Sequence, residues 1–148
     1  MGGGKEVRVS STAYDPDSTV SVHVPHEQVS AAQVRWRMAA DLWAAHVTVQ
    51  EADDALLVLS ELITNAVRHA RPLPRGGLRV SWTISPTQIG VSVTDGGSST
   101  APVATAAAMS AIGGRGLHIV HLLASSWDVT RGEGDTTVRA TMSRGPIA

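Results

Sequence analysis

The sequence contains no cysteine and no phenylalanine among its 148 residues. The absence of cysteine excludes disulfides and thiolate metal sites, and it fits a reducing cytoplasm. No apolar run approaches the roughly 18 residues that a membrane-spanning helix requires, and no apolar segment follows Met1 as it would in a secretory signal. We therefore expect one cytoplasmic domain with a core of Trp, Leu, Val and Ile.

The sequence also lacks an excess of charge of either sign. Its 12 Lys and Arg residues nearly balance its 13 Asp and Glu residues, which gives a formal net charge of −1. We expect neither nucleic-acid nor membrane binding, because this balance offers no basic field. Two common phosphate motifs are missing as well. There is no Gly-Lys-Ser/Thr of a P-loop, and Ile119 stands where a dinucleotide fingerprint starting at Gly114 needs glycine.

Hydrophobic periodicity divides the chain into a tail, residues 1–18, and one domain, residues 19–148. Thr48 and Glu51 have the spacing of a capping box at the start of the second helix. The low-complexity segment 96–112 is predicted to be a mobile lid, because it offers few apolar anchors. Strands are predicted at 19–24, 78–84, 89–94, 127–130 and 136–142, and helices at 26–46, 49–70 and 113–125.

The second predicted helix carries a row of three polar side chains. Glu61, Asn65 and Arg68 follow one another at spacings of four and three, on the side opposite the apolar residues. An acid, an amide and a guanidinium in one row can serve as a general base, a metal ligand and an anion contact. A solvated helix face is the alternative, and for an isolated helix it is the better interpretation.

Two glycine-rich segments follow this helix. The carboxylate of Asp95-Gly96-Gly97 can accept a hydrogen bond from an amine such as that of adenine, although an ordinary Asp-Gly turn has the same sequence. Gly113-Gly114-Arg115-Gly116-Leu117 opens the third helix, where free N–H groups and the positive dipole end suit phosphate. Tight packing explains such glycines equally well.

Together the three motifs resemble the nucleotide site of the ATPase superfamily that includes gyrase, mismatch-repair proteins and histidine-kinase catalytic domains. The closest likeness is to the small bacterial anti-sigma-factor serine/threonine kinases, and it covers residues 19–142. The resemblance implies an α/β fold of the Bergerat type. This is a two-layer sandwich in which a mixed sheet carries three helices on one face and an ATP lid.

The resemblance also implies a role for each motif residue. Glu61 would be the general base, and Asn65 would hold Mg²⁺ against the triphosphate of ATP. Two departures from the family pattern, Ser99 and Asp135 at usual glycine positions, would loosen the lid or weaken affinity. The other nucleotide contacts would be Arg68 near phosphate, Asp95, Gly97 and Thr136 at adenine, and Gly114, Arg115, Gly116 and Leu117 around the phosphates.

By the same resemblance the protein would be an anti-sigma factor that uses Mg-ATP to phosphorylate an anti-anti-sigma antagonist of the STAS type. Its partners would be that antagonist and a sigma factor. The alternative is a regulatory binding module of the same fold without kinase activity, or a slow ATPase if water is the nucleophile. A homodimer through Trp36 and Trp43 is expected too, although core packing explains these residues equally well.

Overall fold

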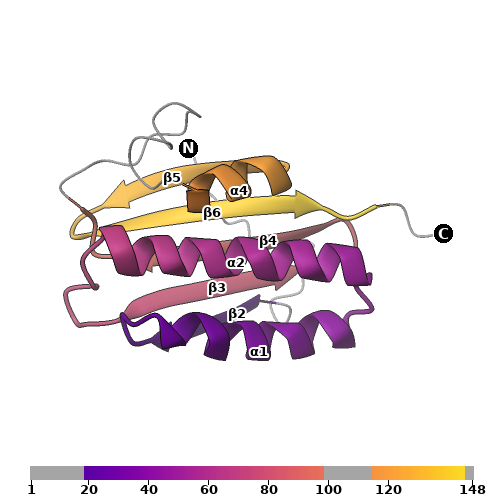
Figure 1. Ribbon diagram of the computed structural model, residues 1–148, viewed down its shortest axis with the longest axis horizontal. Coiled ribbons are helices and arrows are strands. Elements are labelled where there is room, and N and C mark those ends of the chain that lie inside the picture. The colour runs from indigo at the N-terminus through magenta and orange to yellow at the C-terminus, as the bar shows by residue number, and fades with distance from the viewer. Residues whose placement is uncertain (1–18, 99–114, 146–148) are drawn as a thin grey trace.

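The computed structural model describes residues 19–98 and 115–145, which form a sheet covered on one face by helices (Figure 1). None of the helices in these ranges is long and apolar enough to cross a membrane. The predicted tail and most of the predicted lid lie outside the described residues. In chain order the elements are β2 (Thr19–Val24), α1 (Val29–Ala44), α2 (Val49–His69), β3 (Leu78–Ile84), β4 (Gln88–Asp95), α4 (Arg115–Leu123), β5 (Ser126–Gly132) and β6 (Asp135–Ser143).

The sheet has the strand order β2-β3-β4-β6-β5, and the described neighbours are antiparallel throughout. The prediction of a mixed sheet was therefore wrong, while the α/β architecture and the positions of the strands are confirmed. The physical reason lies in the connections. Two successive helices, α1 and α2, join β2 to β3 and reverse the chain direction. Among the described elements α4 stands between β4 and β5 in the chain. Both strands are antiparallel to β6, so they run the same way, but β6 lies between them.

The core lies between the sheet and the helices that the structure describes. Figure 1 shows α1, α2 and α4 on the same face of the sheet, with α2 in the middle, and α2 packs against both α1 and α4. Alternate residues of each strand face this layer, as the period of a half-buried strand requires. One row of such residues crosses the whole sheet in register: Val22, Val80, Val93, Val138 and Val129.

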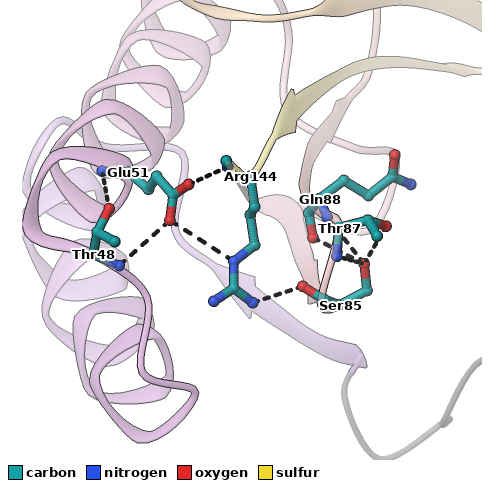
Figure 2. A network of polar contacts seen from close by, with 7 residues as sticks. Thr48, Glu51, Ser85, Thr87, Gln88 and Arg144 are labelled. Atoms are coloured by element: carbon teal, nitrogen blue, oxygen red, sulfur yellow. Dashed lines mark hydrogen bonds and ion pairs between the residues drawn. The ribbon is translucent and has the colours of Figure 1, made fainter. Parts of the chain in front are cut away.

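The first turn of α2 is fixed by the predicted capping box, which the structure confirms. The Thr48 side chain accepts a hydrogen bond from the Glu51 backbone, and a Glu51 oxygen accepts one from the Thr48 N–H. Glu51 also binds the C-terminal segment. It accepts a 2.6 Å hydrogen bond from the Gly145 N–H and pairs with Arg144 at 3.8 Å, and Figure 2 shows Glu51 and Arg144 pointing toward each other. The hydrogen bond from Gly145 is the main cause that lowers the pKa of Glu51.

Candidate active site

Helix α2 presents the predicted polar row at its C-terminal half. Its apolar face, which includes Leu59, Ile63 and Ala66, is buried against the sheet and the neighbouring helices. Packing of this face holds the helix in one rotation, so Glu61 and Asn65 are half-buried beside the core and Arg68 is exposed. The structure thus rejects the interpretation of a fully solvated helix face for the first two residues.

Asn65 has a side-chain oxygen that is enclosed by protein. Among the described residues its Oδ1 atom is buried and has no hydrogen-bond partner. Leaving such an oxygen unpaired costs about 1–3 kcal/mol. Native proteins rarely keep such a group without a reason, and a bound ion or ligand is one of the recognised reasons.

Asp95 and Thr136 form the second part of the site at the end of the sheet. They are register partners on β4 and β6 and are 6% and 7% exposed. The Asp95 carboxylate accepts a 2.7 Å hydrogen bond from the Gly97 N–H. A side chain at Gly97 would come close to Thr136, and Gly97 has a positive φ of 85° that favours glycine. The glycine therefore keeps the approach to the two buried polar residues open.

The environment of Asp95 acts on its ionisation in both directions. Burial is the largest cause and raises its pKa, because the charged form loses hydration. The Gly97 hydrogen bond and the nearby His26 lower it, and the carboxylate of Asp135 raises it further. A carboxyl group that is buried despite the free-energy cost of its charged form is typical of a binding or catalytic site.

The end of β4 is tied to the chain that leaves α2. The Arg71 N–H donates to the Gly97 carbonyl at 2.9 Å, and the Gly96 N–H donates to the Arg71 carbonyl at 2.7 Å. A Cβ atom on Gly96 would collide with the Pro72 carbonyl, so this close approach requires glycine. The two motifs, which are some thirty residues apart in sequence, are thereby joined at one end of the molecule.

His26 belongs to this site and was missed by the sequence reasoning, which placed it only at the start of the first predicted helix. Its Nε2 atom lies 2.9 Å from the Ala70 carbonyl and 3.2 Å from the Ala66 carbonyl, at the C-terminal end of α2. The Ala66 carbonyl also accepts the Ala70 N–H at 3.1 Å, and Ala70 is the C-cap of α2, where carbonyls lack a partner within the helix. The partners are 40 and 44 residues away in sequence, so no local pattern could have identified the contact.

The third predicted motif is described only in part. Helix α4 begins at Arg115, and Leu117 is fully buried in the core. Ser99 and Gly114 lie outside the described residues, and so does the side chain of Arg115. The phosphate contacts predicted for Gly114, Arg115, Gly116 and Leu117 therefore stay predictions.

A magnesium ion fits the residues present. Mg²⁺ prefers oxygen ligands and usually keeps several waters while it binds one or two protein groups and the substrate phosphates. The unpaired Asn65 oxygen would supply one such ligand. In the described part of the chain no three His, Asp or Glu side chains gather as a metal cluster, so the ion would depend on the phosphates for its remaining ligands.

Comparison with known proteins agrees with this geometry. The family model of the histidine kinase-like ATPase domain matches residues 24–142, and the chain belongs to this family. The resemblance seen in the sequence is thus confirmed at the level of the ATPase superfamily. A comparison with curated proteins finds no match.

Among solved structures, the chain is similar to the crystal structure of the RsbU and RsbW domains of Rv1364c from Mycobacterium tuberculosis. The TM-score is 0.67 at 21% sequence identity, over 89% of this chain and 34% of that one. This chain therefore spans about a third of the length of that protein. At this identity the likeness shows the fold.

Proposed function

We propose that the protein binds Mg-ATP between the C-terminal half of α2 and the end of β4, and transfers the γ-phosphoryl group to a serine or threonine of a partner protein. The observation that carries the proposal is the buried, unpaired Oδ1 atom of Asn65. It stands one helical turn after Glu61, at the end of the fold where Asp95 is held. A magnesium ion would give this oxygen its missing partner.

Phosphoryl transfer requires little covalent chemistry from the protein itself. Glu61 would accept the proton of the attacking hydroxyl as that oxygen takes the γ-phosphoryl group and ADP leaves. Asp95 would accept a hydrogen bond from the adenine amino group, with Gly97 and Thr136 beside the ring. Arg68, being exposed at the end of α2, would contact phosphate. The bound metal ion would supply neutralisation of charge on the phosphates.

The partners follow from the likeness to the RsbW domain and remain part of the proposal. We infer an anti-sigma factor that acts in the cytoplasm, with a sigma factor and a STAS-type anti-anti-sigma antagonist as its two partners. The antagonist would accept the phosphoryl group. Transcription would then be regulated by which of the two partners the protein binds.

Calorimetric titration with Mg-ATP tests the nucleotide site. We expect wild type to bind and Asp95→Asn to bind at least about tenfold more weakly, because the amide places its own N–H₂ against the adenine amine and a tenfold loss is about 1.4 kcal/mol. The variant should stay folded. Since burial raises the pKa of Asp95, the ionised form costs folding free energy at neutral pH and its removal does not destabilise the protein.

Asp128→Asn is the matched control for this titration. Asp128 is an exposed carboxylate on β5 that pairs with Arg139 at 3.9 Å, and its variant should bind Mg-ATP as wild type does. Failure of wild type to bind Mg-ATP would refute the proposed site.

Phosphoryl transfer is tested separately, with antagonists encoded near the gene as acceptors. Wild type should yield phosphoserine or phosphothreonine, and Glu61→Gln should bind Mg-ATP but lose transfer by about 10²-fold or more. Intact ATP binding without transfer to any such antagonist would refute the proposed kinase activity but would support the proposed nucleotide site.

One observation favours the second candidate, a nucleotide-responsive binding module without kinase activity. Asp135 stands at a usual glycine position of the family, and its charge opposes that of Asp95. A negative charge here disfavours both an ionised Asp95 and an anionic ligand. Partner binding that is unaffected by Glu61→Gln, with no phosphorylated product, would support the module.

A further inference from the structure

Helix α1 exposes a line of large apolar side chains on its outer face. Val29, Trp36 and Trp43 are 54%, 84% and 85% exposed, and they follow one another at intervals of seven residues. Two turns of an α-helix take about seven residues, so the three lie along one side of the helix. We call these three residues the tryptophan stripe.

The tryptophan stripe is not part of the core. The inner side of α1 is formed by Val34, Met38 and Leu42, which are at most 2% exposed. Core packing, the other explanation that the sequence left open for the two tryptophans, is therefore excluded. A tryptophan can bury roughly 200 Å² in a contact, so the two rings offer a few hundred Å² of mostly apolar surface. An apolar patch of that size marks an interaction site.

The charges on this face of α1 have one sign. Arg35 and Arg37 flank Trp36, are exposed, and form no ion pair with any described residue. The carboxylate of α1, Asp41, is turned inward and accepts a 2.8 Å hydrogen bond from the buried Trp82 indole. The tryptophan stripe is therefore bordered by positive charge without a compensating acidic side chain on the same helix.

We propose that the tryptophan stripe docks an acidic amphipathic helix of a partner protein. A straight apolar line with a seven-residue repeat fits a second helix packed along α1, whose own apolar side chains would interdigitate with the rings. Carboxylates beside that apolar line would pair with the two arginines. Tryptophan and arginine are the residues that most often dominate binding energy at protein interfaces.

A second copy of the chain fits this face less well. An antiparallel pair of α1 helices that matches the whole stripe has its two-fold axis at Trp36. On one flank Arg35 then lies near Arg35 of the other copy, and on the other flank Arg37 lies near Arg37. Like charges so placed oppose pairing. The docking surface requires no nucleotide chemistry and therefore goes beyond the proposed ATP site.

Photo-cross-linking in the native host tests the occupant directly. A photoreactive phenylalanine replaces Trp36, and the same residue placed at the exposed Arg79, on the opposite face of the sheet, is the control. We expect an adduct at position 36, and none of the same protein at position 79. Mass spectrometry should map the adduct to a helical segment in which acidic residues flank an apolar line.

A synthetic peptide of the mapped segment then tests the charge. It should bind wild type, and the Arg35→Glu/Arg37→Glu double variant should weaken binding at least tenfold. Arg79→Glu should leave it unchanged. Mg-ATP titration of the double variant should match wild type, so failure of the docking surface and failure of the ATP site are told apart.

Three results would each overturn the proposal. These are no adduct at position 36, an adduct with a second copy of the chain, and a mapped segment whose binding is unaffected by reversal of the two arginine charges. Unfolding is not a concern for the variants, since all the substituted side chains are exposed and such changes usually alter stability by less than about 0.5 kcal/mol.

Discussion

Asn65 combines a proposed function with a cost to the nucleotide-free protein. Its buried Oδ1 atom has no hydrogen-bond partner among the described residues, and asparagine is a weaker helix former than alanine. We expect Asn65→Ala to raise the free energy of unfolding without nucleotide by about 1 kcal/mol, because both effects act in the same direction. Magnesium-dependent ATP binding should be lost. Urea denaturation and calorimetry measure the two quantities.

Gln50→Ala is the control for this change on the same helix. Gln50 donates a 2.9 Å hydrogen bond to Asp54 near the start of α2, far from the site. Its substitution should leave ATP binding unchanged and should not stabilise the fold. If Asn65→Ala destabilised the nucleotide-free protein, the side chain would have a structural role, and its assignment as a metal ligand would lose its main support.

Asp135 provides a second prediction at this scale. Burial is the largest cause of the raised pKa of Asp95, and the negative charge of Asp135 raises it further. Asp135→Asn should lower the pKa of Asp95 and tighten Mg-ATP binding by roughly threefold, the size expected of one partly screened charge. Glu133→Gln, which removes an exposed carboxylate from the same turn, should change neither. Titration of Asp95 by carbonyl NMR and calorimetry would show whether the two variants differ.

At the scale of single elements, α2 depends on the contact between its first turn and the C-terminal segment. Glu51→Gln should lower the free energy of unfolding by about 1 kcal/mol at neutral pH, because the neutral amide forms weaker hydrogen bonds with the Gly145 and Thr48 N–H groups. Asp53→Asn, an exposed carboxylate two residues further on, should cost much less.

The pH dependence of this difference has a definite sign. The folded protein lowers the pKa of Glu51 from its ordinary value of 4.5, so ionised Glu51 stabilises the fold above that value. The stabilisation is lost as the pH falls through the lowered pKa. Urea denaturation at a series of pH values should therefore show wild type and Glu51→Gln converging as the pH falls below 4.5 and through the lowered pKa. A difference that is independent of pH would contradict this cause.

At the scale of the whole molecule, α2 is the centre on which the other elements pack. It contacts α1, α4, β4 and β6. Ile63 is fully buried on its inner side, and Leu57 is 41% exposed on the same helix. Ile63→Ala should cost about 3 kcal/mol in unfolding free energy, since it leaves a cavity, and Leu57→Ala should cost less than about 1 kcal/mol. Equal losses would mean that the two faces of α2 were assigned wrongly.

Much of the fold followed from local patterns. Alternation of apolar and polar residues predicted all five described strands to within one or two residues, and Thr48 with Glu51 predicted the start of α2. The direction of the strands did not follow, and the sheet was wrongly predicted to be mixed. Pairing partners are far apart in sequence, as with Val91 and Ala140, and no local pattern records them.

The candidate site, like the fold, could be predicted only in part from local patterns. The row of Glu61 and Asn65 on one side of a helix was predictable, because its spacing is that of the helix itself. His26 was not, because its contacts lie at the far end of another element. Gly114 and Ser99 fall outside the described residues, and the roles assigned to all of the site residues are still predictions.

By itself, the sequence determined which segments are helix and strand, which faces are apolar, and which residue types could bind a nucleotide, because periodicity and side-chain chemistry are local properties. Only the tertiary structure decided that the Asn65 oxygen is buried without a partner and that Asp95 faces Thr136. It alone also decided that Trp36 and Trp43 point away from the core. Burial and pairing depend on which distant segments pack together, and in this chain that is set by the antiparallel sheet beneath α2.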